Sequence, residues 1–297
     1  MDAGAALTAE AAASVSGCAL PPAIFKALEE LAHVPNERKT RRSKEAHWMP
    51  VEDAAARSLR RPRVLVEQVV QYIYRHVLPF ELPGLRGVEW WVHSRAPTEK
   101  MHFHFDRDEF LWEHQRVMKH PTVSSVLYVT DAGGPTLVLD QRHDGDGGLA
   151  PAAPLHGYVY EPDANSFATF SGDLLHGVLP SGRIQRRLPD ADVADDRTEE
   201  DVREGARRVT LLMNWWCSDV TDEDGALSAE LSQEERWAYG AVNSKLKWAQ
   251  PNKRMRRREP LLLEEEVRSL YTYDIAVDDS SSEDSEGGRS PGELDRC

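Results

Sequence analysis

Eight short apolar or aromatic segments, separated by turn residues, follow one another between residues 88 and 216. They lie at 88–93, 101–106, 123–130, 135–140, 157–161, 166–170, 173–179 and 208–216, with glycine-containing turns at 133–134, 145–148 and 171–172. Segments of this length bounded by turn residues are typical of β-strands. Because no helical pattern alternates with them, we expect a mainly β fold with flanking helices and a jelly-roll or related double-sheet core.

Two helices are expected before this region. The first, over residues 21–33, has a proline in its first turn and apolar residues at helical spacing. The second, over residues 63–77, is apolar at every fourth position from Leu65 through Val69 to Ile73. Both helices are predicted to pack against the outside of the sheets.

Differences in residue composition and hydrophobic pattern divide the chain into five parts. We predict a disordered N-terminus (1–19), a helical N-terminal support (20–85), a β domain (86–218), a C-terminal helical segment (219–273) and an acidic disordered tail (274–297). Residues 183–207 contain almost no large apolar side chains, so they are expected to form an acidic loop inserted in the β domain.

The formal net charge of −14 is concentrated in two segments. Residues 190–204 and residues 274–297 each contain eight acidic residues against two arginines, which leaves the rest of the chain at −2. This distribution excludes a strongly basic nucleic-acid-binding protein.

The compartment is indicated by what the sequence lacks. Its three cysteines, Cys18, Cys217 and Cys297, form neither a disulfide framework nor a metal-binding pair, which fits a reducing compartment. The N-terminus does not resemble a signal peptide, and no stretch approaches the ~20 apolar residues of a membrane span. We therefore expect a protein of the cytoplasm or nucleus that does not contact a membrane.

The densest group of potential metal ligands lies at residues 101–109. In a strand, His104 and Asp106 project to the same side, so both can bind one ion. His176 lies on a later predicted strand, after the turn at 171–172. Two imidazoles and one carboxylate form the facial set of ligands that leaves coordination positions of Fe(II) open, whereas a buried histidine bonded to a backbone carbonyl is the structural alternative for His176.

A candidate anion-binding pair opens the last predicted strand. Arg208 and Thr210 share a face of that strand, while Arg207 points the other way. A guanidinium group offers a fixed fork of donors to a carboxylate, and the neighbouring hydroxyl adds one donor. The structural alternative for an arginine here is a salt bridge to the acidic loop, for which Arg207 is the better placed residue.

The motifs occur in a recognisable order. They are His104-Phe105-Asp106, residues 125–130, Gly133-Gly134-Pro135-Thr136, residues 172–177 and Arg208-x-Thr210. This order, over about residues 86–216, resembles that of the Fe(II)/2-oxoglutarate-dependent dioxygenases, most closely their prolyl 4-hydroxylase-like branch.

The resemblance implies a double-stranded β-helix in which His104, Asp106 and His176 bind Fe(II). It also implies that Arg208, assisted by Tyr128 and Thr210, pairs with the distal carboxylate of 2-oxoglutarate. The expected reaction uses O2 to hydroxylate a C–H bond of an intracellular peptide or small molecule, with release of succinate and CO2.

The chain departs from the family pattern in two places. Arg208 follows His176 by 32 residues instead of about ten, and the acidic insertion accounts for the excess. Arg183, seven residues after His176, is the rival anchor, but it lies in a turn-rich stretch. Gly-Gly-Pro-Thr also replaces the more usual Gly-Gly-Glu-Thr, which preserves the two glycines of the turn.

Two other interpretations remain open. The residues His102, His104, Glu109 and His176 fit a cupin-type metal-binding barrel, although the glycine that follows the cupin glutamate is absent. A barrel that retained its shape and lost turnover would instead be a binding module.

Overall fold

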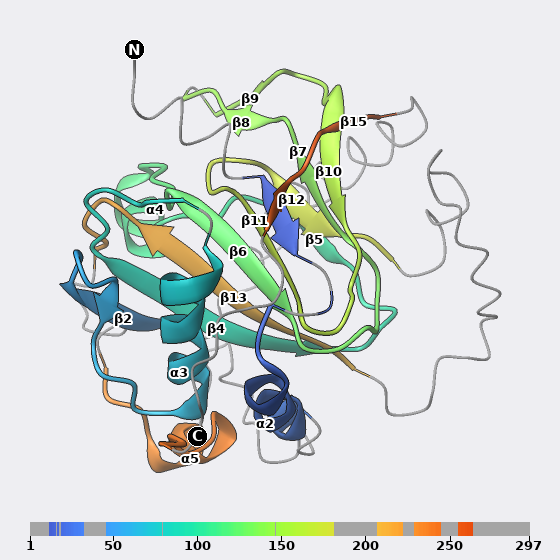
Figure 1. Cartoon of the computed structure of the whole chain (residues 1–297). Helices are drawn as coiled ribbons and strands as arrows, with labels where there is room; N and C mark the ends of the chain where they lie inside the picture. The colour runs from blue at the N-terminus through green and yellow to red at the C-terminus, as the bar shows by residue number, and fades with distance from the viewer. Residues whose placement is uncertain are drawn as a thin grey trace, which may run out of the picture.

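A computed structural model describes residues 12–15, 17, 19–32, 46–78, 80–145, 147–180, 207–221, 229–244 and 255–263 (Figure 1). Eight strands form the centre of the fold, and each overlaps one of the eight predicted segments. They are β4 (Gly87–Arg95), β5 (Met101–His104), β6 (Val123–Tyr128), β7 (Thr136–Leu139), β10 (His156–Tyr160), β11 (Ser166–Ser171), β12 (His176–Val178) and β13 (Arg208–Trp216). The expectation of a mainly β fold is confirmed.

Two antiparallel sheets share these strands. The larger sheet has the order β14-β1-β11-β6-β13-β4-β2-β3, and the smaller has the order β15-β10-β7-β12-β5. The strands that extend the sheets are β1 (Ala13–Val15), β2 (His47–Asp53), β3 (Ser58–Leu59), β14 (Arg256–Arg257) and β15 (Leu261–Leu262), while β8 (Arg142–His143) and β9 (Leu149–Ala150) form a separate pair. Consecutive core strands alternate between the two sheets, except that β7 is followed by β10 in the smaller sheet, which is the arrangement of a double-stranded β-helix.

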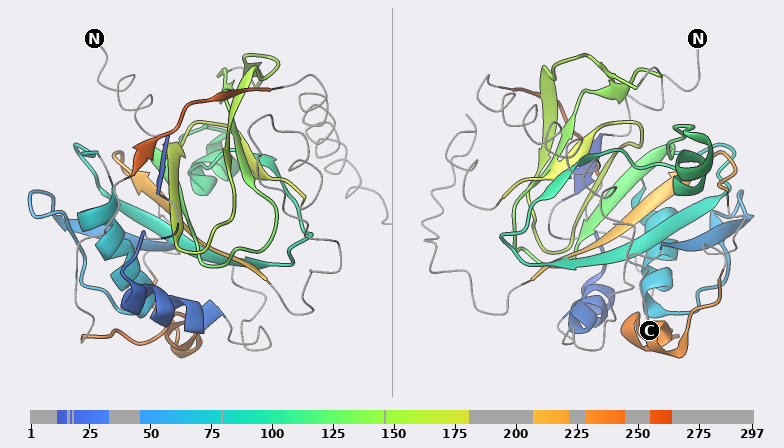
Figure 2. Two further views of the ribbon diagram at one scale, coloured as in Figure 1. Left: turned by 45° about the vertical axis from the view of Figure 1, so that its right-hand side comes forward. Right: turned by 180° about the vertical axis from the view of Figure 1, so that it is seen from behind.

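The helical segments span Pro22–Ala32 (α2), Leu65–Tyr72 (α3), Ile73–Val77 (η2, the π-helical continuation of α3), Glu109–Gln115 (α4) and Gln233–Ala238 (α5). Helices α2, α3 with η2, and α5 lie on the outer side of the larger sheet, whereas α4 lies apart from them (Figure 2). Apolar residues of α2 and α3, such as Ile24 and Val69, share one hydrophobic core with Trp90 of β4 and Leu211 of β13. Within the described residues, no helix has the length and apolar character needed to cross a membrane.

The opposite face of the larger sheet points toward the smaller sheet, and its side chains fall into three rows. From β6 through β13 to β4, the rows are Ser124–Asn214–Glu89, Val126–Leu212–Trp91 and Tyr128–Thr210–His93. Because successive side chains of a strand alternate between faces, the residues between them belong to the outer core. The inner face therefore has two polar rows on either side of an apolar one.

The N-terminal part of the chain differs from the prediction. The expected disorder of residues 1–19 is wrong for Ala13–Val15, which form β1 and pair with β11 and β14. The segment is held by Asn165, which has a left-handed backbone (φ 61°) and whose amide bonds both Leu20 N (2.8 Å) and Leu20 O (2.9 Å). A short, weakly apolar segment is thus ordered by partners far away in the sequence.

Two other predicted boundaries also need correction. The supposedly helical support 20–85 contains β2 and β3, and the supposedly helical segment 219–273 contains β14 and β15 besides the short helix α5. These strands lie at sheet edges, where long-range pairing decides the structure. The tail 274–297 and all of the acidic loop except Arg207 lie outside the described residues.

Candidate metal and dicarboxylate site

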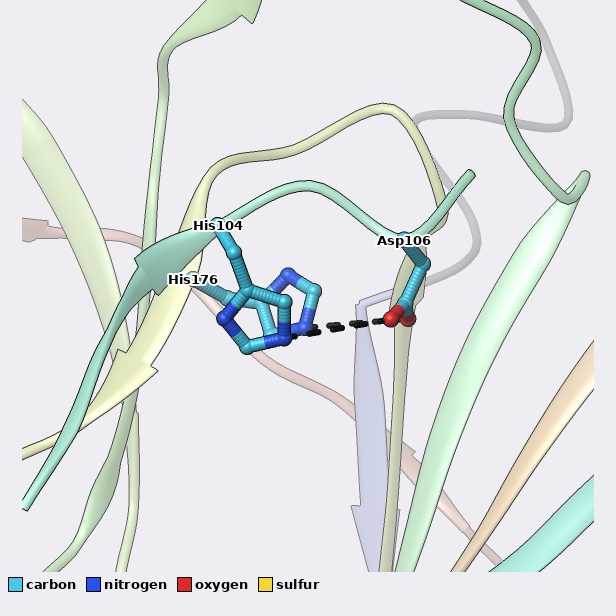
Figure 3. Close-up of side chains that lie close together, drawn as sticks. All are labelled: His104, Asp106 and His176. Atoms are coloured by element: carbon cyan, nitrogen blue, oxygen red, sulfur yellow. Dashed lines mark ion pairs between the residues drawn. The ribbon is translucent and has the colours of Figure 1, made fainter. Parts of the chain in front are cut away.

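Three predicted ligands meet at one end of the space between the sheets (Figure 3). One ligand atom each from His104, Asp106 and His176 lies within 4.8 Å of the others. Asp106 is 4.0 Å from His104 Nε2 and 3.6 Å from His176 Nε2. Within the part of the chain that the structure describes, no other group of three such side chains is assembled.

Strand pairing and backbone hydrogen bonds orient the two imidazoles. His104 at the end of β5 lies directly opposite His176 at the start of β12. Each ring places Nδ1 2.9 Å from a carbonyl oxygen, that of His102 for His104 and that of Leu174 for His176. Since a carbonyl only accepts a hydrogen bond, Nδ1 carries the proton, and the lone pair on Nε2 is available to a metal.

Asp106 is positioned by a loop instead of by strand alternation. The predicted strand 101–106 ends at His104, so Asp106 lies in the connection to α4. Its Oδ2 accepts a hydrogen bond of 2.6 Å from Ser124 Oγ, and its main-chain oxygen is 2.8 Å from Nδ1 of His120. These contacts turn the carboxylate toward the two histidines.

The protonation of the cluster suits metal binding. Burial lowers the pKa of His176 to about 4, although the Asp106 carboxylate acts in the opposite direction. His176 is therefore neutral near pH 7 and retains a lone pair. Two imidazoles and one carboxylate, with the remaining directions free of protein ligands, are a donor set that fits Fe(II).

The cupin-type arrangement is not assembled. Glu109 lies on the exposed helix α4, its side chain is 64% exposed, and its carboxylate is 3.1 Å from Arg107 Nε. His102 is likewise exposed. The structure thus brings two of the four cupin residues, His104 and His176, to the cluster and replaces the glutamate by Asp106.

A buried arginine lies on the same inner face. Arg208 is 3% exposed, and its guanidinium donates to Thr136 Oγ1 (3.0 Å) and Gly134 O (3.3 Å) and lies 5.5 Å from the centre of the Tyr128 ring. Among the described residues, no carboxylate is within salt-bridge distance of Arg208. Burial without a counter-ion lowers the pKa of this guanidinium, which nevertheless remains charged.

The neighbouring hydroxyl of Thr210 also lacks a protein partner. Thr210 is fully buried, and its Oγ1 makes no hydrogen bond within the described structure. Tyr128 lies opposite Thr210 in the same row, with its hydroxyl 2.7 Å from Thr136 Oγ1. A buried cation without a counter-ion and a buried hydroxyl without a hydrogen-bond partner are what an anion with hydrogen-bond acceptors would satisfy.

The two glycines of the predicted turn leave room for close neighbours, Gly133 for the Arg208 side chain and Gly134 for the backbone of Leu179. A Cβ on Gly133, whose φ is +94°, would approach Arg208 Cδ to 2.7 Å, and one on Gly134 would overlap the backbone of Leu179. Arg207 points away from this space and donates to Ser94 through Nε (2.8 Å to Oγ) and Nη2 (2.6 Å to the carbonyl). The rival anchor Arg183 lies outside the described residues.

Sequence reasoning missed three polar residues of the inner face. Thr136 was recognised as part of a motif but not as the partner of Arg208, and Ser124 was not connected to Asp106. Glu89 was also missed, although an acidic residue between two apolar neighbours in a predicted strand is an unusual feature. Burial and the negative charge of Asp106 raise the pKa of Glu89 to about 7.

The hydrogen bond from Ser124 to Asp106 is expected to strengthen metal binding. Removing an outer partner of a ligand typically costs 10–100-fold in metal affinity, so Ser124→Ala should weaken Fe(II) binding by about 10-fold or more. Ser125→Ala is the matched control, because the hydroxyl of Ser125 bonds Met213 O and Trp215 Nε1 on the opposite face. Anaerobic Fe(II) titration of both variants tests this; equal affinities would contradict it.

Comparison with known proteins gives structural neighbours only. No protein-family model and no curated protein matches the chain. A prolyl-4-hydroxylase from Pseudomonas putida is similar over 73% of this chain and 97% of its own, at 16% identity and a TM-score of 0.39. A 2OG-Fe(II) oxygenase family oxidoreductase from Burkholderia pseudomallei is similar over 74% and 93%, at 12% identity and a TM-score of 0.38.

A third neighbour carries ligands. HygX from Streptomyces hygroscopicus, with nickel and 2-oxoglutarate bound, is similar over 71% of this chain and 84% of its own, at 11% identity and a TM-score of 0.36. By their descriptions, two of these neighbours are a prolyl-4-hydroxylase and a 2OG-Fe(II) oxygenase family oxidoreductase, and the third has 2-oxoglutarate bound.

Proposed function

We propose that the protein is an Fe(II)- and 2-oxoglutarate-dependent dioxygenase that hydroxylates a C–H bond of a peptide or small molecule. In this reaction 2-oxoglutarate, O2 and R–H give succinate, CO2 and R–OH. His104, Asp106 and His176 would hold the metal, and Arg208, Tyr128 and Thr210 would hold the cosubstrate.

One observation carries the proposal: a buried arginine without a counter-ion, on the inner face of the larger sheet, accompanies an assembled His-Asp-His cluster contributed by the smaller sheet and the loop after β5. His93 connects the two places, since it lies beside Thr210 in its row and both Arg208 and His104 are close enough to act on it electrostatically. A ligand that satisfies both must be an anion at one end and a metal chelator at the other. 2-Oxoglutarate has both properties.

Each protein group has a distinct task in this scheme. Bound Fe(II) would supply the redox chemistry and the coordination positions for O2 and the 2-oxo acid. Arg208 neutralises the distal carboxylate with two parallel donors and so fixes the orientation of the cosubstrate. Thr210 donates its free hydroxyl, and the apolar row that contains Val126 excludes water from the space between the two polar ends.

Slow conversion of 2-oxoglutarate without a second substrate tests the proposal directly. The wild-type protein, supplied with Fe(II), O2 and ascorbate, is expected to form succinate, detected by NMR, while His176→Ala forms none above the protein-free background. Succinate production that is equal in both proteins would contradict the assignment. Binding of metal and 2-oxoglutarate without any succinate would identify the barrel as a binding module.

A further inference from the structure

The inner face of β4 is the accessible side of the site. Glu89, Trp91 and His93 point inward at the β4 end of the three rows, and each is partly exposed. Their row neighbours Asn214 and Thr210 on β13 are buried. In Figure 1, β13 lies between β6 and β4, in agreement with the strand order. A substrate that reaches the metal cluster would therefore contact β4.

Glu89 has one satisfied and one free carboxylate oxygen. Its Oε2 accepts hydrogen bonds from Trp216 Nε1 (3.1 Å) and Asn214 Nδ2 (3.5 Å). Its Oε1 accepts none from the described residues and is not among their buried unpartnered atoms, so it contacts solvent. No lysine, arginine or histidine in the described structure lies within 4.0 Å of this carboxylate.

The charges of the metal, its carboxylate ligand, Arg208 and the proposed cosubstrate balance one another without Glu89. Fe(II) and Arg208 together carry as much positive charge as Asp106 and a dicarboxylate carry negative charge. In the metal-free protein Arg208 likewise balances Asp106 alone. An ionised Glu89 is therefore the unbalanced group in both states, and a partly buried carboxylate is stabilised by a cation.

We propose that Glu89 binds a positively charged group of the substrate, an alkylammonium or a guanidinium, and that Trp91 packs against its alkyl chain. The inference rests on the proposed function for the identity of the reaction. Glu89 lies two strands away from Ser124, the partner of Asp106, a separation of about 10 Å. The cationic group would thus be a few bonds from the carbon that is oxidised, as in a lysine or arginine side chain or a small diamine.

The indole N–H of Trp216 is a direct reporter, because it donates to Glu89. The full-length protein is labelled with ¹⁵N-tryptophan, and the indole N–H signals are assigned with two variants. The Trp216 signal is the one that shifts in Glu89→Gln, and the Trp91 signal is the one that disappears in Trp91→Phe. We expect n-butylguanidinium to shift both signals in a saturable manner, while n-butanol and butyrate at equal concentration do not. The signal of Trp237 on α5, outside the barrel, should stay in place.

Two variants decide whether Glu89 is responsible. Glu89→Gln should weaken butylguanidinium binding at least 10-fold, whereas Glu99→Gln, which removes an exposed charge paired with Arg95, should leave it unchanged. Equal shifts by butanol and butylguanidinium, or equal affinity in Glu89→Gln, would overturn the inference. Fe(II) and 2-oxoglutarate binding by the wild-type protein is measured separately. Failure of that binding, with cation binding retained, would overturn the proposed function and leave the cation site.

Discussion

Asp106→Ala is expected to reduce Fe(II) binding to the non-specific level and to abolish succinate formation. The carboxylate is the anionic member of the cluster and lies within 4.0 Å of Nε2 of both His104 and His176. Without it, two imidazoles remain, which do not form the facial ligand set of a non-haem iron site. Anaerobic Fe(II) titration followed by metal analysis after desalting measures the loss.

Two control variants distinguish the His-Asp-His metal site from a cupin-type metal site. His102→Ala and Glu109→Ala should bind Fe(II) as the wild-type protein does, because both residues are exposed and Glu109 pairs with Arg107. If these two variants lose the metal and Asp106→Ala retains it, the cupin-type ligand set is correct and the triad is wrong.

Arg208→Ala is expected to raise the apparent dissociation constant of 2-oxoglutarate by 10²-fold or more. The distal carboxylate would lose its buried partner, and leaving one member of such a pair unpaired costs on the order of 3 kcal/mol. Fe(II) binding should change little, since Arg208 bonds Thr136 and Gly134 and none of the three ligands. Calorimetric titration of 2-oxoglutarate into the metal-loaded protein measures the effect.

Arg207→Ala is the neighbouring control. Its side chain bonds Ser94 on the outer side of the sheet, so the 2-oxoglutarate constant should stay within about twofold of wild type. An unchanged constant in Arg208→Ala, together with loss of binding in Arg183→Ala, would show that Arg183 is the anchor.

The parts of the fold with a local signal could be predicted from the sequence. All eight core strands alternate apolar and polar residues or are bounded by turns, and both features are visible in the sequence. The same alternation distinguished Arg208, which the structure buries, from Arg207, which it turns outward. The two arginines are separated because successive side chains of a strand project to opposite faces of the sheet.

Features that depend on distant partners could not be predicted. β1 is a weakly apolar segment that becomes a strand because Phe167–Thr169 offers it an edge, and β14 consists of two arginines that pair with β1. Asp106 lies in a loop, and a hydrogen bond from Ser124 orients its carboxylate toward the two histidines. Strand alternation predicted that Asp106 and His104 lie on the same side, which is correct, but Asp106 is not in a strand. The interaction of Glu89 with Trp216 crosses between strands and has no signature along the chain.

The central claim is that one site holds Fe(II) through His104, Asp106 and His176 and 2-oxoglutarate through Arg208. Anaerobic addition of Fe(II) and then 2-oxoglutarate, followed in the visible spectrum, tests it most directly. We expect a weak charge-transfer band that saturates at one equivalent of each, is absent in Asp106→Ala, and in Arg208→Ala requires at least 10²-fold more 2-oxoglutarate. Fe(II) binding without any such band, or an equal band in Asp106→Ala, would contradict the claim.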